Sequence, residues 1–323
     1  MAKQRHHYVP RAYLKFFCDQ GGKLRVYLKD DPGRSIVQAP DSTAFHKYYY
    51  SQPLAEGGKD HDTLEDFFSK VEEKWPPLVE RMQRREDLND ALTDIYEFVA
   101  LQRARVPALR DASERMAAVT LKSTLLQLDA MGELPPKPAE HPDILDHVDI
   151  AIDPHHSIHS MSTFVRAMGM VLDRVGLGIL HNLTDIPFIT SDNPVVYFDP
   201  SRGDEDPVPY TLNRQGGTVV LCFPITPKLM LYGHSSMRES FAHYGLRHSD
   251  IAKVETVAMM NRNTSRYGYR AVFADRAGFE DLVRQHAHES PIVKSTIVQQ
   301  GNGTLIWHQS VFGKREPKPK WNG

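Results

Sequence analysis

Two hydrophobic periodicities divide this chain of 323 residues, and their order along the sequence limits the fold more than any other feature. In the first half, apolar side chains recur every three or four positions, which is the pattern of amphipathic helices. From Leu177 onward the pattern shortens to strand-like runs separated by turn residues. We therefore expect an α+β fold in which long helices pack on a mostly antiparallel sheet. It would form a single domain over 1–323, with a helical part at about 60–175 and a sheet-rich part at about 176–312.

The expected elements follow this division. A small N-terminal β element is predicted from Leu24–Leu28 and Phe45–Tyr50. One helix is predicted over 62–82, and a second from about Asp87 until Pro107 kinks or ends it. The later expected elements are strands at 177–183, 188–190, 195–198, 218–223, 228–232, 271–273 and 305–308, and helices at 161–175, 250–263 and 279–288.

Composition and charge narrow the class of protein. With 41% hydrophobic and 25% charged residues, the composition is that of an ordinary globular protein rather than a disordered or fibrous one. The formal net charge of -2 provides no general attraction to nucleic acids or anionic membranes, so such a partner would need a local basic patch. Locally basic stretches lie near the two ends, at Lys3, Arg5, Arg11 and Lys15 and at Lys314, Arg315, Lys318 and Lys320. Solvated charges are the favoured interpretation of the second group.

Cysteine content and the first residues bear on the compartment. Cys18 and Cys222 are the only cysteines, too few for a disulfide framework or a thiolate zinc site. The opening MAKQRHHYVP lacks the apolar core of a signal peptide, and the most apolar later stretch is interrupted by Arg166, Asp173 and Arg174. We therefore expect a cytoplasmic protein in a reducing environment, with no membrane span.

Several familiar catalytic motifs do not occur in the sequence. These are a Walker-type phosphate loop, a Rossmann glycine pattern, a nucleophile-elbow serine and a zinc-binding helix with paired histidines. The opening, in contrast, sets His6 and His7 in front of an apolar, helix-like segment. Histidine is the side chain best suited to proton transfer or metal ligation near neutral pH. From spacing alone, a functional pair and a solvated terminal pair both remain open.

Four short motifs spread over the chain are similar to those of one bacterial family. The motifs are His6-His7-Tyr8-Val9-Pro10 with Tyr13-Leu14 and Phe16 or Phe17, Gln102-Arg103-Ala104-Arg105-Val106-Pro107, Ile189-Thr190-Ser191-Asp192-Asn193-Pro194 and Phe223-Pro224-Ile225-Thr226-Pro227. Asn261, within a later expected helix, also fits. Together they make the chain resemble the bacterial family called domain of unknown function 4238. The resemblance spans most of the chain and implies no established activity.

Two glutamates on the first expected helix are candidate metal ligands. Glu65 and Glu72 stand seven residues apart, so two helical turns place them one above the other at the edge of the apolar stripe. His61 falls on the same edge. Carboxylates suit magnesium or manganese, and imidazole suits several transition metals. Amphipathic helices also have polar flanks without any metal; this is the favoured interpretation for His61, and both remain open for the glutamates.

Polar side chains interrupt the apolar stripe of the second expected helix. Gln102 and Arg103 lie within or beside that stripe, and Arg105 follows them. Polar groups in an interior must find hydrogen-bond partners. A guanidinium there usually pairs with a carboxylate or a phosphate, so either arginine can hold an acidic residue or an anionic ligand. A structural ion pair is the commoner outcome, and several converging groups would favour a site.

The segment Ser191-Asp192-Asn193-Pro194 lies between two expected strands. The proline restricts Asn193 to an extended or turn conformation, so Asp192 and Asn193 would project from one end of the sheet. There they can serve a site. An Asx turn, in which the aspartate accepts hydrogen bonds from nearby backbone N–H groups, explains the motif equally well.

These residue types lead to a catalytic hypothesis, a metal-dependent hydrolase that acts on a phosphodiester, such as a nuclease. Glu65, Glu72 and Asp192 would hold a divalent cation, magnesium or manganese. The substrate would be a phosphate-containing molecule or a nucleic acid.

The remaining candidates have distinct roles in this hypothesis. His6 or His7 would activate water or protonate the leaving oxygen, and Arg105 would stabilise charge on the phosphate. Gln102 and Asn193 are the candidates for contacting a bound cofactor. The alternative is a non-catalytic binding or regulatory module, in which the same groups form a buried polar network. A catalytic site needs an open pocket that reaches these groups, whereas a structural network would be closed and fully hydrogen-bonded.

Overall fold

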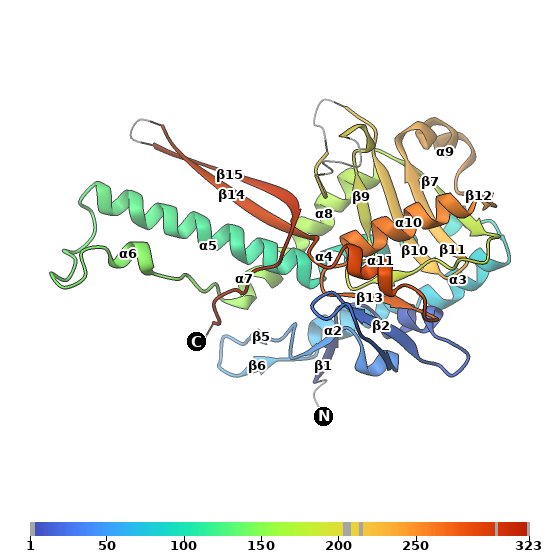
Figure 1. The fold of residues 1–323 in the computed structure, drawn as a ribbon, viewed down its shortest axis with the longest axis horizontal. Helices are drawn as coiled ribbons and strands as arrows, with labels where there is room; N and C mark the ends of the chain where they lie inside the picture. The colour runs from blue at the N-terminus through green and yellow to red at the C-terminus, as the bar shows by residue number, and fades with distance from the viewer. Residues whose placement is uncertain (1–3, 203–207, 213–215, 301–302, 322–323) are drawn as a thin grey trace.

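The computed structural model describes residues 4–202, 208–212, 216–300 and 303–321. Lys3, one of the basic residues near the start, lies outside the described residues. Two main sheets and the helices around them form a body, and a long helix and a hairpin extend together away from it (Figure 1). The strands pair mostly antiparallel, which confirms the expected α+β class.

The larger sheet of the described part has five strands, in the order β12-β7-β11-β10-β9. In that order the strands are Arg247–Ile251, Gly176–Asn182, Leu229–His234, Val220–Thr226 and Val196–Phe198. Neighbours are antiparallel except β12 and β7, which are parallel. Every residue of β10 is buried, because both faces of the sheet are covered.

The two faces of this sheet belong to different parts of the core. Leu221 and Phe223 of β10 join the largest apolar cluster, which also contains residues of the helices in the first half. Val220 and Cys222 point to the opposite face and join a second cluster with α10 (Val254–Tyr267). The sheet is therefore a layer between α10 and the helices of the first half.

The smaller sheet combines strands from the N-terminal part of the sequence with strands from its second half. Its order is β3-β2-β13-β8, with β3 at Ser35–Gln38, β2 at Leu24–Leu28, β13 at Ala271–Ala274 and β8 at Thr190–Ser191. All three pairings are antiparallel. The N-terminal β element is thus completed by a strand from late in the chain.

The helical run after residue 62 is broken in two, so the prediction of one helix over 62–82 is wrong. α2 spans Thr63–Glu72, and α3 spans Trp75–Gln83. Pro76 and Pro77 occupy the first turn of α3. Because prolines have no backbone N–H, they cannot make the hydrogen bonds that a continuous helix would need at these positions. The two glutamates of interest lie on α2, ahead of the break.

The next helices meet at a proline, as expected. α4 (Leu92–Ala104) ends before Pro107, and α5 (Pro107–Ala130) begins with it. α5 packs along a hairpin of β14 (Ser290–Gln300) and β15 (Gly303–Gly313), and both extend from the body (Figure 1). β14 was not predicted, and β15 is longer than the strand expected at its centre.

The remaining helices and strands are mostly short. In chain order they are β1 (Arg5–His7), α1 (Arg11–Leu14), β4 (Phe45–Lys47), β5 (Gln52–Pro53), β6 (Lys59–Asp60), α6 (Ile144–His147), α7 (Pro154–His159), α8 (Met161–Leu172), α9 (Arg238–Tyr244) and α11 (Glu280–Gln285). The helix expected from Asp250 starts only at Val254, since β12 occupies the residues before it. None of the helices among the described residues combines the length and the apolar character of a membrane-spanning segment.

Candidate functional site

The strands β1 and β4 bring the first polar side chains of a candidate site together. They pair antiparallel, with Arg5 opposite Lys47 and His7 opposite Phe45. Because side chains alternate along a strand, Arg5, His7 and Lys47 share one face, and His6 points to the other. His6 is fully buried, whereas the other three polar residues line a cavity.

Helix α2 supplies acidic groups to the same cavity. Glu65, Ser69 and Glu72 are spaced by four and three residues, so they lie on one face of the helix. All three line the cavity together with His7. The structure therefore brings both predicted glutamates and one of the predicted histidines to a shared site.

This site, the His7 cavity, has a volume of about 620 Å³, which is within the range of small-molecule sites. Its lining residues are Gln4, Arg5, His7, Arg11, Asp41, Lys47, Glu65, Ser69 and Glu72. At its rim Arg11 pairs with Asp41 at 2.7 Å, and both side chains are more than half exposed. The cavity thus combines an imidazole with charges of both signs.

The imidazole of His7 is neutral at neutral pH. Burial, and next the Arg11 guanidinium, lower its pKa to about 4, although a hydrogen bond with the backbone of Asp41 opposes the shift. Its Nε2 atom is buried and has no hydrogen-bond partner among the described residues. A neutral imidazole with an unused ring nitrogen can accept a proton, as a general base does.

Arg105 holds Glu72 and does not line the cavity. Its Nη1 donates to Glu72 Oε1 at 2.7 Å, and its Nη2 donates to Gln102 Oε1 at 3.2 Å. Gln102 in turn donates to the backbone oxygen of Tyr8 at 3.1 Å. Arg105 is only 1% exposed. The guanidinium expected to contact a phosphate therefore orients a carboxylate, and Gln102 is bonded within the fold.

His6 is held in the interior behind the cavity. Its Nδ1 accepts a hydrogen bond from the backbone N–H of Tyr50 at 2.9 Å. The two rings are nearly parallel, with centroids 5.8 Å apart and an interplanar angle of 7°. Of the two candidate imidazoles, His7 is the one that reaches the cavity.

Asp192 lies apart from the His7 cavity, so the structure does not bring it together with Glu65 and Glu72. It is fully buried, and its two carboxylate oxygens accept backbone hydrogen bonds from Tyr269 at 2.7 Å and Arg270 at 2.8 Å. Burial raises the pKa of this carboxyl, and the backbone hydrogen bonds oppose the shift. In the expected Asx turn the carboxylate would accept hydrogen bonds from nearby backbone N–H groups. Here the backbone donors belong to Tyr269 and Arg270, which are distant in the sequence.

Asn193 is also committed to the interior. Its Nδ2 donates to the Tyr210 hydroxyl at 2.7 Å and to the backbone oxygen of Tyr267 at 2.8 Å. Its Oδ1 accepts a hydrogen bond from Arg103 at 3.3 Å. Neither Gln102 nor Asn193, the candidates for cofactor contacts, lines the His7 cavity.

The acidic groups of the cavity fit one kind of metal binding and not another. Among the described residues, no group of three or more His, Cys, Asp or Glu side chains is placed to hold a metal ion. Magnesium, however, is commonly bound by one or two carboxylates together with substrate phosphate oxygens and water. Glu65 and Glu72 therefore fit a cation that arrives with an anionic substrate, and they do not make a structural metal site.

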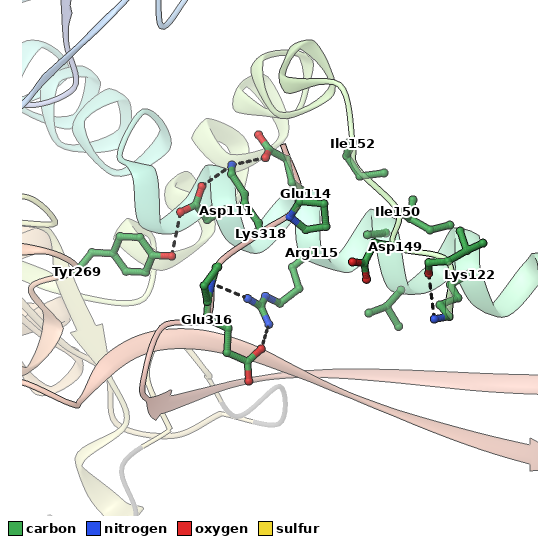
Figure 2. Close-up of a pocket in the computed structure, with 15 residues that line it drawn as sticks. Asp111, Glu114, Arg115, Lys122, Asp149, Ile150, Ile152, Tyr269, Glu316 and Lys318 are labelled. Atoms are coloured by element: carbon green, nitrogen blue, oxygen red, sulfur yellow. Dashed lines mark hydrogen bonds and ion pairs between the residues drawn. The ribbon is translucent and has the colours of Figure 1, made fainter. Parts of the chain in front are cut away.

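A second hollow, the α5 groove, lies between α5, the segment 148–152 and the C-terminal residues 316–319 (Figure 2). Its volume is about 270 Å³. Part of its lining is apolar: Ala118, Val119, Val148, Ile150, Ile152, Pro317 and Pro319.

The charges of the α5 groove are matched by the C-terminal segment. Figure 2 shows the Lys318 ammonium between Asp111 and Glu114, and it lies 2.7 Å from the Asp111 carboxylate. Arg115 pairs with Glu316 at 2.5 Å. These groups attach the end of the chain to α5, so we do not place chemistry here.

Six residues of the His7 cavity were not predicted as site residues: Gln4, Arg5, Arg11, Asp41, Lys47 and Ser69. Ser69 could have been found, because helical spacing puts it between Glu65 and Glu72 on one face. Asp41 and Lys47 could not, since their positions depend on how distant segments meet in the fold. The local basic charge near the N-terminus was the available signal for a cationic rim.

Comparison with known proteins adds a family and no activity. The family model described as "Protein of unknown function (DUF4238)" matches residues 5–278, which confirms the resemblance noted in the sequence. No curated protein and no solved structure matches this chain. The match includes all of the His7 cavity except Gln4, whereas β14, β15 and the segment bound to α5 lie beyond it.

Proposed function

Because this chain belongs to the DUF4238 family, whose description assigns no activity, we propose its function from the chemistry of the His7 cavity. The proposed function is hydrolysis of a phosphodiester, as in a nuclease, with the help of a divalent cation. One observation carries the proposal. Side chains suited to binding an anion, accepting a proton and holding a cation come from separate segments of the chain and line one cavity.

The basic side chains of the cavity suit an anionic substrate. Arg5, Arg11 and Lys47 line it, and guanidinium groups bind phosphate oxygens with charge-assisted hydrogen bonds. The pair between Arg11 and Asp41 is exposed, so it contributes little and a phosphate group can compete for the arginine. Binding of the substrate would therefore require the loss of only a weak, exposed ion pair.

His7 is the proposed general base. Its Nε2 has no partner among the described residues, and the ring is neutral because burial lowers its pKa to about 4. A phosphodiester beside the ring adds negative charge, which raises the pKa of an adjacent imidazole and strengthens it as a base. His7 can then take the proton of an attacking water, and the leaving oxygen, which departs on the opposite side of the phosphorus, takes its proton from solvent.

Glu65 and Glu72 are the proposed protein ligands of the cation, which would stabilise negative charge on the phosphate when bound. Arg105 contributes indirectly, since its hydrogen bond fixes the position of the Glu72 carboxylate. Arg105 is therefore a positioning residue in this proposal.

A second candidate is binding of a phosphate-containing ligand in the same cavity without catalysis. One observation favours it: the Oε1 atom of Glu72 already accepts a hydrogen bond from the buried Arg105. A carboxylate held in a structural ion pair is a poorer cation ligand than a free one. The cavity would then act through Arg5, Arg11 and Lys47.

The test is hydrolysis of bis(p-nitrophenyl) phosphate and of single- and double-stranded DNA and RNA, with and without magnesium or manganese. We expect His7→Asn and Glu65→Gln to lower the rate at least about 100-fold, as is typical for loss of an acid–base group or of electrostatic stabilisation. Their melting temperatures should stay close to that of the wild type.

The matched control is Glu73→Gln, because Glu73 follows α2 directly and is exposed outside the cavity. It should retain full activity. Metal-independent binding of inorganic phosphate that Arg11→Gln weakens, with no turnover of any substrate, would favour the second candidate. Turnover that survives both His7→Asn and Glu65→Gln would contradict the catalytic proposal.

A further inference from the structure

A third cavity lies between the larger sheet and α10, away from the His7 cavity. Its volume is about 510 Å³, again within the range of small-molecule sites. The three strands β9, β10 and β11 contribute Phe198, Cys222 and Tyr232, among others, and α10 contributes Met260 and Tyr267. We call it the aromatic cavity.

The strand register of the larger sheet explains which of its residues line the aromatic cavity. Val220 of β10 is opposite Phe198 of β9 and His234 of β11, and Cys222 is opposite Tyr232. Residues directly opposite each other in antiparallel strands project to the same face. These two rows therefore point together toward α10, which covers that face.

Four aromatic rings line the cavity, those of Phe198, Tyr232, Tyr267 and Phe312. Phe312 of β15 meets Tyr267 edge to face, with ring centroids 5.0 Å apart and an interplanar angle of 86°. Phe198 lies 6.2 Å from Tyr267 between centroids. Met259 and Met260 add flexible thioethers, which make favourable contacts with aromatic rings. Such walls suit a flat aromatic molecule, which can make edge-to-face and stacked contacts.

One residue that lines the aromatic cavity has a buried polar atom without a partner. Tyr267 is 2% exposed, and its hydroxyl has no hydrogen bond to any described residue. Its backbone oxygen is fixed by Asn193 at 2.8 Å, so the residue is held in place. Buried unpaired hydroxyls are rare in folded proteins, and a ligand group that hydrogen-bonds to this one would remove the deficit.

The ionisable groups of the cavity favour a neutral ligand over an anionic one. Burial raises the pKa of Cys222 and that of Tyr232 to about 12, so both side chains are uncharged at neutral pH. Arg266 pairs with Glu289 at 2.8 Å, and Asp199 accepts hydrogen bonds from a neighbouring serine. Because the guanidinium of Arg266 is already paired, an anionic ligand would lose its hydration without gaining a free counter-charge, and the Asp199 carboxylate would repel it.

From this geometry we propose that the aromatic cavity binds a neutral aromatic molecule of one or two fused rings, with a hydroxyl or carbonyl group that hydrogen-bonds to Tyr267. The aromatic cavity and the His7 cavity share no lining residue. This inference is therefore independent of the proposed phosphodiester chemistry.

The experiment is isothermal titration calorimetry of the full chain with 2-naphthol, compared with the anion 2-naphthoate at the same pH. We expect one saturable site per chain for 2-naphthol and at least tenfold weaker binding of 2-naphthoate. Tyr267→Phe keeps the ring and removes the hydroxyl. It should weaken 2-naphthol binding about fivefold, the effect of one hydrogen bond, without lowering the melting temperature.

A matched pair of methionine variants tests the location. Met259 lines the cavity and is 46% exposed, so Met259→Trp can narrow the entrance without disturbing the core. We expect it to weaken 2-naphthol binding at least tenfold. Met170 on α8 is 66% exposed and does not line the cavity, so Met170→Trp should leave binding unchanged. No saturable binding of 2-naphthol, equal binding of the anion, or equal effects of the two tryptophans would each overturn the proposal.

Discussion

The His7 cavity and the α5 groove contain similar side chains but differ in how these are satisfied. In the α5 groove, Lys318 is matched by Asp111 and Glu114, and Arg115 by Glu316. In the His7 cavity, Nε2 of the buried imidazole has no partner among the described residues. Charges that are all paired with one another hold two segments of the chain together. A polar atom that is held in place without a partner, such as Nε2 of His7, can instead bind a ligand or react.

The two regions also differ in their relation to the family. The His7 cavity lies almost wholly within the matched residues 5–278, and the C-terminal segment of the α5 groove lies beyond them. Both regions are rich in charged side chains, so charge alone would not show which of them is the better candidate for a functional site. Burial, pairing and the extent of the family match separate them.

The largest expected effect comes from the ion pair behind the His7 cavity. Arg105 is 1% exposed, so Glu72→Gln would leave a buried guanidinium without its carboxylate. We expect a loss of about 3 kcal/mol in the free energy of unfolding, measured by urea denaturation. Glu73→Gln, at the exposed neighbouring position, should change it by less than about 0.5 kcal/mol. Equal values for the two variants would mean that Arg105 does not depend on Glu72.

The next effect is a pH dependence that originates in His7. Its pKa is about 4 in the folded protein and 6.5 for the ordinary side chain, so the unfolded state binds the proton more readily between these values. Its contribution to stability is therefore present above pH 6.5 and lost as the pH falls toward 4. Because the ring is partly solvated, we expect about 1–2 kcal/mol.

The measurement is the free energy of unfolding of the wild type and of His7→Asn at pH 7 and near pH 4. Other acidic groups titrate in both proteins, so the difference between the two proteins isolates His7. The stability of His7→Asn should fall less on acidification. Parallel curves would show that the folded state does not disfavour protonated His7.

A smaller effect is expected in the α5 groove. Lys318→Ala removes the ammonium beside Glu114, whose side chain is 7% exposed but keeps a hydrogen bond from Ser157 at 2.8 Å. We expect a loss of about 1 kcal/mol at low salt, smaller in 1 M sodium chloride. Faster proteolysis near the C-terminus should accompany it. If Lys318→Ala lowered the free energy of unfolding as much as Glu72→Gln does, the ion pairs of the α5 groove and of the His7 cavity would not differ in their importance for stability.

The smallest effect is expected at the outer end of the groove. The side chains of Arg115 and Glu316 are 31% and 69% exposed, so their pair is largely solvated. Arg115→Met keeps most of the aliphatic contact and should change the free energy of unfolding by less than about 0.5 kcal/mol. Thermal denaturation with the wild type in parallel can resolve this. A loss above 1 kcal/mol would show that this pair also holds the C-terminal segment.

The sequence predicted a helix or strand correctly where its own pattern of apolar residues was sufficient to form it. β2 occupies the residues expected for a strand, Leu24–Leu28, because Leu24, Val26 and Leu28 stand at alternate positions. The break before α3 was missed, since the apolar spacing continues through Trp75 and Leu78, although the two prolines between them lack the N–H groups that a continuous helix needs. β14 was missed because Lys294–Thr296 interrupt its apolar residues.

The site was predictable where it depends on one element. Helical spacing was enough to put Glu65 and Glu72 on a common face, and the opening motif singled out His7. The position of Asp192 was not predictable, because its carboxylate finds its donors across the pairing of β8 with β13. The sequence indicated that Arg103 or Arg105 holds an acidic residue, but the choice of Arg105 and Glu72 could not be predicted, since it depends on where α2 packs on α4.

The pairing of β2 with β13 has a consequence for how the molecule is made. During synthesis β2 emerges early, but the strand that covers one of its edges ends only at Ala274. Until then the backbone N–H and C=O groups of that edge can pair with another strand, including one from a neighbouring nascent chain. A chain terminated before β13 would therefore be prone to aggregate. In the full chain, β2 acquires this native neighbour only after most of translation is finished.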